Sequence, residues 1–300
     1  MNTTSKLAIG AALLLLATSS LAQTDTADDA DSLRMAALEA LISAPPERAL
    51  PIVDKVLSGN HSAELKESAL FILSQMETPE SQSRLLAFAN DSQGELQAEA
   101  IRMIGIGGDK DALAALGDIY RTGGGEVREA VLEAYLIAGD KDAVFNIAIN
   151  TENEEEFSDA VNMLGAMGAN EQLRELRGRA GLSDSLIEAY AISGDAESLR
   201  ELAMDASNPE MQKRAIEALG IVGGDEVNQT LIALYDSTEN SDIRESALEG
   251  MLIAGHDAGV LELYRKADNA AEKRRLLEYL VMMDSDAVWD LIDNALEGSE

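Results

Sequence analysis

The 300-residue sequence contains no cysteine. This absence excludes disulfides, a thiol nucleophile, a thiolate metal site and a cysteine for lipid attachment. Histidine occurs only as His61 and His256, in separate parts of the chain, and there is no His-Glu-x-x-His motif, so a histidine-based metal centre is not expected. Aromatic residues make up only 4% of the chain. A core of this composition must be filled mainly by Ala, Leu, Ile and Val.

Basic residues are also scarce. The 23 Lys and Arg against 55 Asp and Glu give a net charge of −32 at pH 7. Proteins bind nucleic acids and anionic membranes by neutralising phosphates with Lys and Arg, so this chain is expected to repel both. Basic proteins or divalent ions are better matched to the charge. The alternative is that the carboxylates only keep an apolar-rich chain soluble and monomeric.

The longest apolar run lies close to the N-terminus. Lys6 precedes the apolar residues 7–17, and Ser20 and Ala22 occupy the two positions that a signal peptidase reads. The sequence therefore predicts a signal peptide in residues 1–22, an acidic disordered leader in residues 23–31, and a periplasmic or secreted protein with no membrane insertion after cleavage. A membrane anchor is the alternative, but the run is shorter than the roughly 18 to 20 residues that span a bilayer.

A pattern of helical spacing recurs about every 30 residues after this leader. In each copy, apolar residues at offsets of four, five and eight share one helical face, as Leu96, Ala100, Ile101 and Ile104 do. Each copy opens with an acid that complements the helix dipole; these acids are Glu64, Glu95, Glu126, Glu156, Glu210 and Asp242. The helix ends at a Gly followed by Asp or Asn, and a second striped helix begins there.

The repeating unit is therefore a helix, a tight turn and a second helix. A single unit cannot bury its own apolar stripe, so neighbouring units must stack. The sequence predicts an all-α fold, a right-handed α-solenoid of about nine helical hairpins over residues 32–300. A short spacer at residues 178–183 predicts a hinge or a change of curvature there.

The unit at residues 126–140, Glu-Val-Arg-Glu-Ala-Val-Leu-Glu-Ala-Tyr-Leu-Ile-Ala-Gly-Asp, resembles the HEAT repeat, particularly the short form named after the phycobilisome bilin lyases. The position after the opening hydrophobe carries Lys66, Arg128 and Arg244, but Gln97, Ser158 and Gln212 in other copies. The resemblance implies a HEAT-like array, which serves mostly as a scaffold or adaptor. Tetratricopeptide repeats are the alternative, although their period is longer.

No pattern points to catalysis. The glycine clusters at residues 105–108 and 123–125 lack the Gly-Lys-Ser/Thr of a phosphate loop, and pairs such as Asp109 and Asp111 lack the later Gly and Glu of a calcium loop. We therefore predict no catalytic residue, no metal site, no cofactor and no enzymatic activity. Two alternatives remain open: an ion-responsive or elastic regulatory element, and an unrecognised enzyme that uses Asp/Glu pairs.

The predicted partner is another protein of the cell envelope, bound by a monomer. The resemblance implies binding along the inner curve, which second helices line in HEAT-like arrays. Large aromatic residues and Arg are enriched at binding hot spots. Next to the second-helix stripes, the candidate partner-binding residues are Phe145, Arg174, Arg200, Tyr235, Tyr264 and Trp289. Packing between repeats is the alternative for Tyr235, Tyr264 and Trp289.

Overall fold

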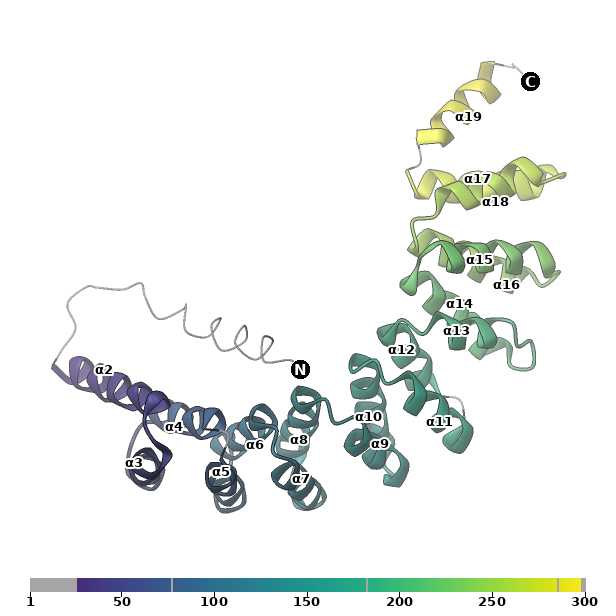
Figure 1. Cartoon of the computed structure of the whole chain (residues 1–300). Coiled ribbons are helices and arrows are strands. Elements are labelled where there is room, and N and C mark those ends of the chain that lie inside the picture. Colours follow the sequence, from purple (N-terminus) through teal and green to yellow (C-terminus); the bar gives the residue numbers. More distant parts are fainter. Residues whose placement is uncertain (1–25, 77, 182, 285, 298–300) are drawn as a thin grey trace.

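The computed structural model describes residues 26–297 except residues 77, 182 and 285. Within these ranges the chain is built from α-helices and one 3-10 turn, η1 (Ala40–Ser43), with no strand. Nine helical hairpins stack into a long curved array (Figure 1). The predicted all-α solenoid of about nine hairpins is confirmed. The predicted signal peptide lies outside the described residues.

Each hairpin has a first and a second helix. The first helices are α2 (Thr26–Glu39), α4 (Ala63–Gln75), α6 (Glu95–Gly107), α8 (Gly125–Ala138), α10 (Glu154–Ala166), α12 (Asp184–Ser193), α14 (Pro209–Val222), α16 (Ser241–Ile253) and α18 (Ala270–Met282). The second helices are α3 (Pro46–Ser58), α5 (Pro79–Asp91), α7 (Lys110–Thr122), α9 (Lys141–Asn150), α11 (Asn170–Ala180), α13 (Ala196–Ala203), α15 (Asp225–Ser237), α17 (Asp257–Lys266) and α19 (Asp286–Glu297).

The first helix begins earlier than the sequence predicted. We expected a disordered leader up to residue 31, but α2 starts at Thr26. Residues 26–31 of the predicted leader are therefore helical, and residues 23–25 lie outside the described part of the chain. Acidic residues are favourable in the first turn of a helix because their charge complements the helix dipole. A run of acids is thus compatible with a helix start as well as with a solvated tail.

The predicted aspartate caps are confirmed at Asp109, Asp140 and Asp195. The same prediction is wrong for Asn170, Asp225 and Asp257, because each of them is already the first residue inside its helix. Gly108 and Gly139 close α6 and α8 in the left-handed conformation, with φ of 67° and 73°. In the next position, Asp109 and Asp140 accept hydrogen bonds from the backbone N–H groups that open α7 and α9. Each of these two turns therefore satisfies free groups at two helix ends.

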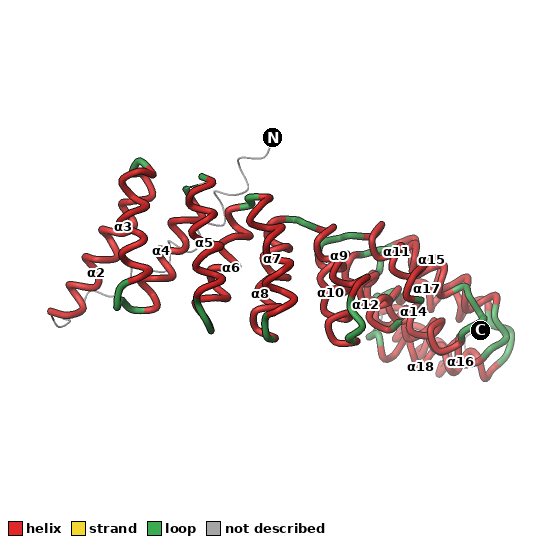
Figure 2. Tube along the Cα trace, turned by 90° about the horizontal axis from the view of Figure 1, so that it is seen from below, coloured by secondary structure: helices red, strands yellow, loops and turns green. Residues whose placement is uncertain are grey.

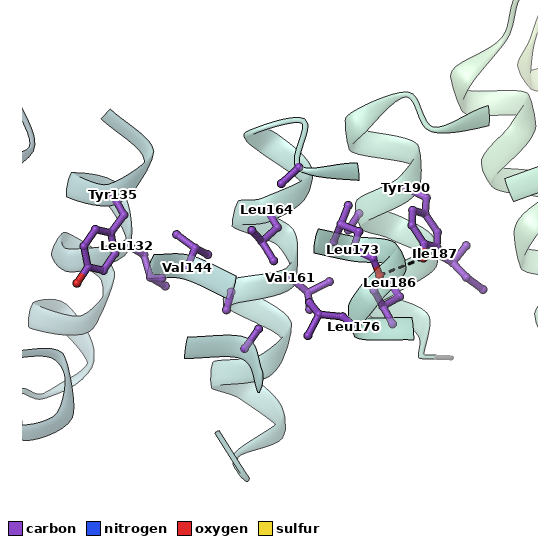
Figure 3. Close-up of a cluster of buried hydrophobic side chains, with 14 of the residues drawn as sticks. Leu132, Tyr135, Val144, Val161, Leu164, Leu173, Leu176, Leu186, Ile187 and Tyr190 are labelled. Carbon is purple, nitrogen blue, oxygen red and sulfur yellow. Dashed lines mark hydrogen bonds between the residues drawn. The ribbon is translucent and has the colours of Figure 1, made fainter. Parts of the chain in front are cut away.

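One hydrophobic core runs through the whole stack, from Leu38 to Val288. Figure 3 shows its middle section. There, Val144 of α9 lies between Leu132 of α8 and Leu164 of α10, so the second helix carries the core from one hairpin to the next. Tyr190 is fully buried, and its hydroxyl donates to the Leu173 carbonyl over 3.2 Å. The predicted apolar stripes are the residues that fill this core.

First helices pack closely on one another through small residues. A Cβ atom at Gly105 would lie 2.6 Å from Ala134 Cα, and one at Gly220 would lie 2.6 Å from the Gly250 carbonyl oxygen. In Figure 1, α4, α6 and α8 lie on the inner side of the curve and α3, α5 and α7 on the outer side. The prediction that second helices line the inner curve is therefore wrong in this half of the molecule, because the small residues let the first helices approach more closely.

The stack opens at two joints. The residue three positions before the turn differs between first helices. It is glycine in α6, α10 and α14, each of which is in close contact with the next first helix; these residues are Gly105, Gly165 and Gly220. It is Leu136 in α8 and Leu252 in α16. α8 and α10 stand further apart than α6 and α8 (Figures 1 and 2). Cavities of about 690 Å³ and 560 Å³ lie beside Leu136 and Leu252. We call these the open joints.

The spacer at residues 178–183 does not open the stack. Next to it, α10 and α12 pack closely, because a Cβ atom at Gly165 would lie 2.9 Å from the Ala189 carbonyl oxygen. Packing between successive first helices is thus set by side-chain size in the first helix, and the short spacer leaves it unchanged.

Candidate protein-binding surface

Two of the predicted partner-binding residues are arginines that form ion pairs with carboxylates of the solenoid itself. Arg174 Nη2 lies 2.8 Å from Asp195 Oδ1 and 3.1 Å from Glu197 Oε2, and its Nε donates to Ser198 Oγ over 3.0 Å. These contacts join α11 to α13. Arg200 Nη2 lies 3.5 Å from Glu226 Oε2, which joins α13 to α15. Both guanidinium groups connect neighbouring second helices.

The predicted aromatic residues differ in exposure. Tyr235 is buried, and its hydroxyl donates to Glu272 Oε1 over 3.1 Å. Tyr264 lies under Lys273 Nζ, which is 5.7 Å from its ring centroid, and Phe145 packs against the core. Trp289 of α19 is 49% exposed. The structure therefore spreads the six predicted residues along the second helices and does not bring them into one site.

The first helices carry an exposed apolar row that our sequence analysis missed. Ile192 is 50% and Ile221 67% exposed, although isoleucine is usually buried. Both stand two positions before the turn glycine that ends their helix. The full row, at the same position in five first helices, is Ile137, Ile192, Ile221, Ile253 and Met282. In α10 this position is Ala166.

An acidic residue precedes each member of this row by four positions, which is one helical turn on the same face. These residues are Glu133, Glu188, Glu217, Glu249 and Glu278. We call the ten residues together the Glu-Ile ladder. Glu188, Glu217 and Glu249 form no ion pair with any described residue, whereas Glu133 binds Arg102. Glu278 is also paired, with Arg274. The ladder thus presents an apolar group beside an available carboxylate at Ile192, Ile221 and Ile253.

The ladder faces outward from the first-helix layer. The opposite face of each first helix contributes the buried stripe, such as Ile216 and Leu219 in α14. The sequence does contain the signal: an isoleucine two positions before the turn recurs from Ile106 to Ile253, outside the stripe that fills the core. We interpreted only the stripe, so the off-stripe repeat was not recognised.

The open joint between α8 and α10 is bridged by an ion pair between Arg128 and Glu156. Arg128 lies over the Tyr120 ring at 5.7 Å, and its Nε donates to the Tyr120 carbonyl over 3.2 Å. Burial and the nearby Glu156 charge raise the pKa of the Tyr120 hydroxyl. Thr151 Oγ1 donates to Glu156 Oε2 over 2.9 Å and fixes that carboxylate.

The second open joint repeats this arrangement. The guanidinium carbon of Arg244 lies 5.2 Å from the centroid of the Tyr235 ring, and its Nε donates to the Thr238 carbonyl. Arg244 Nη1 lies 3.8 Å from Glu272 Oε1 of α18. At the close joints, the equivalent residues are Gln97 and Gln212, whose side chains donate to the carbonyls of Ala89 and Ala203. At both open joints, the first helix therefore carries Arg at this position and Leu eight residues later. At two close joints, it carries Gln at this position and Gly eight residues later.

Comparison with known proteins agrees with this architecture. Residues 55–136 and 191–251 match the family model of HEAT repeats, so the chain contains HEAT repeats in these segments. No curated protein matches the sequence.

Three solved structures illustrate the similarity. The complex of CpcE and CpcF of phycocyanin lyase from Nostoc is 17% identical, with a TM-score of 0.30, and the match covers 84% of this chain and 95% of that one. Human deoxyhypusine hydroxylase is 17% identical, with a TM-score of 0.33, over 76% of this chain and 99% of that one. An engineered protein is 19% identical, with a TM-score of 0.26, over 78% of this chain and 95% of that one. At these values the similarity supports no conclusion about function.

The described part of the chain contains no helix that is long and apolar enough to cross a membrane. Among the same residues, no three His, Asp or Glu side chains are grouped so that they could hold a metal ion.

Proposed function

We propose that the protein is an exported, acidic HEAT-repeat scaffold or adaptor that binds another protein of the cell envelope along its first-helix face. In this proposal it acts as a monomer and catalyses no reaction. The observation that carries the proposal is the Glu-Ile ladder. Exposed apolar rows beside polar residues mark interaction surfaces, because burying them against a partner removes apolar area from water.

The repeated spacing of the ladder supports an extended partner. Five first helices each contribute one apolar group and one carboxylate, so the surface offers the same contact at four successive hairpins, from α12 to α18. A partner segment that follows the stack would meet Ile192, Ile221 and Ile253 in turn. Solenoids present binding surfaces of this extended kind, because each repeat contacts only its neighbours.

Export is supported by the N-terminal sequence. Lys6, the apolar residues 7–17 and the small residues Ser20 and Ala22 have the order of a signal peptide. The absence of cysteine is compatible with an envelope protein held by an apolar core alone.

The proposal predicts loss of partner binding when the ladder is made polar. Capture from the envelope fraction of the source cells with the double variant Ile192→Ser, Ile221→Ser should lose a protein that the parent chain retains, by about tenfold or more. Quantitative mass spectrometry of the captured proteins measures this loss.

The parent protein recovered from that fraction should begin at Gln23.

The matched control is Ile52→Ser with Met204→Ser. These residues are 45% and 58% exposed, but they lie in α3 and at the end of α13, away from the ladder. The control should retain the partner. Equal loss in both double variants, or retention in both, would refute binding through the ladder.

A further inference from the structure

The cavity at the first open joint lies where the ladder is interrupted. It has a volume of about 690 Å³ and is lined mainly by α8 and α10. Leu136 lines it immediately before Ile137 of the ladder, and Ala166 lines it at the ladder position of α10. A segment that follows the ladder from α8 to α12 must therefore cross the mouth of this cavity.

One part of the cavity wall is apolar. Leu132, Leu136, Met163 and Ala166 form it, and the methionine side chain adapts readily to different shapes. A space of this volume accommodates a long side chain together with water. The apolar wall suits a side chain with a hydrocarbon stem.

Acidic residues line another part of the cavity. Glu129, Glu155 and Asp159 line the cavity and form no ion pair with any described residue. The one cation in the lining, Arg128, is already bound to Glu156. In addition, Asn162 Oδ1 is buried and has no hydrogen-bond donor. Buried polar atoms normally have a partner, so this acceptor is available to a ligand.

We propose that this cavity binds one Arg or Lys side chain of the partner segment that lies on the ladder. This inference rests on the proposed scaffold function. The methylene stem packs against Leu136 and Met163, and the cationic head reaches the carboxylates and Asn162 Oδ1. Basic side chains commonly bury their stems in this way while the charged end stays among polar groups. Hydrogen bonds between a cation and carboxylates are stronger than neutral ones.

The partner segment therefore has a defined chemistry. It carries apolar residues for the isoleucines of the ladder and a basic residue between them for the cavity. Such a segment also complements the net charge of −32. Charge complementarity of this kind raises the association rate and excludes acidic competitors.

The test uses the whole protein labelled with ¹³C at its methionine methyl groups. The probes are N-acetyl-arginine amide and N-acetyl-citrulline amide, which have nearly the same shape, but citrulline is neutral. We expect the arginine probe to shift the Met163 methyl signal saturably and the citrulline probe to bind at least about fivefold more weakly. The Met103 methyl, buried in α6, serves as the internal reference and should not shift.

Variants locate the site. Glu129→Gln with Asp159→Asn should weaken the arginine probe by about fivefold or more. Asp111→Asn with Glu171→Gln removes the same charge from α7 and α11, outside this cavity, and should leave the affinity unchanged. The proposal is overturned if Met163 does not respond, if both probes act equally, or if both double variants weaken binding equally.

Different results would contradict the cavity site and the scaffold function. An unresponsive Met163 combined with ladder-dependent capture would remove the cavity site and leave the scaffold function intact. A specific Met163 response combined with ladder-independent capture would leave a cation site but contradict the scaffold function.

Discussion

Replacing Gly105 by leucine is expected to destabilise the protein by about 3 kcal/mol. A Cβ atom at this position would lie 2.6 Å from both the Cα and the carbonyl oxygen of Ala134. The obstructing atoms belong to the backbone of α8, so they cannot move aside by changing a rotamer. The stack must open at that joint, and urea unfolding followed by circular dichroism should show the loss.

The control is Gly178→Leu. Gly178 also lies in a helix, α11, but a Cβ atom there would meet no atom within 4 Å. At an exposed helix position, leucine is more favourable than glycine by up to about 1 kcal/mol. This variant should therefore be as stable as the parent or slightly more stable. A Gly105→Leu protein with parent-like stability would show that close contact between α6 and α8 does not hold the stack together.

Replacing Asp195 by asparagine should cost about 2 kcal/mol of stability at neutral pH. Asp195 is a buried acid at the start of α13, where it accepts hydrogen bonds from the backbone N–H and the hydroxyl of Ser198. It also binds Arg174 at 2.8 Å. The neutral amide keeps the shape but loses the charge that holds Arg174, so α11 and α13 are joined less firmly.

The same variant should alter the response to acid. Burial alone would raise the pKa of Asp195, but hydrogen bonds from Arg174 and Ser198 outweigh burial and lower it. The stabilisation is therefore fully present above the unfolded-state pKa of about 3.9, and it is lost as the pH falls through the lower pKa of the folded state.

Urea midpoints measured across this pH range test the prediction. The difference between parent and Asp195→Asn should shrink as the pH falls through the folded-state pKa. Asp118→Asn, which breaks an exposed ion pair with Arg121, should change stability by less than about 1 kcal/mol at any pH. A difference at Asp195 that grows on acidification would contradict the assigned role of its charge.

The sequence was sufficient to predict the hairpins because their signals are local. Apolar residues at offsets of four, five and eight define a helix face. A glycine followed by an aspartate, as in Gly139 and Asp140, satisfies both helix ends within a few residues. Both patterns depend only on residues that are close together in the sequence, so they predict local structure independently of the tertiary packing.

The layer on the inner curve could not be predicted in this way. It depends on contacts between residues about 30 positions apart, such as Gly105 and Ala134. The sequence shows that one position carries Gln97, Arg128 or Gln212. That Gln is paired with Gly, and Arg with Leu, eight residues later can be interpreted only when the distance between successive first helices is known. Curvature is a property of pairs of repeats.

The ladder was not identified from the sequence, for a related reason. Arg174 and Arg200 were chosen because Arg is enriched at binding hot spots and both lie next to second-helix stripes, yet each of them binds a carboxylate within the solenoid. The ladder isoleucines recur in the sequence outside the buried stripe, but only the stripe was interpreted. How far each isoleucine is exposed depends on how its helix packs against its neighbours.

Site-specific photo-crosslinking tests the central claim most directly. A photoreactive phenylalanine analogue placed at Ile221, Ile253 or, as a control, Ile52 would be activated in the envelope fraction of the source cells. We predict that positions 221 and 253 join one and the same protein through a segment that contains Arg or Lys between apolar residues, and that position 52 does not. Adducts formed only from position 52, or from none of the three positions, would contradict a scaffold that binds through its first-helix face.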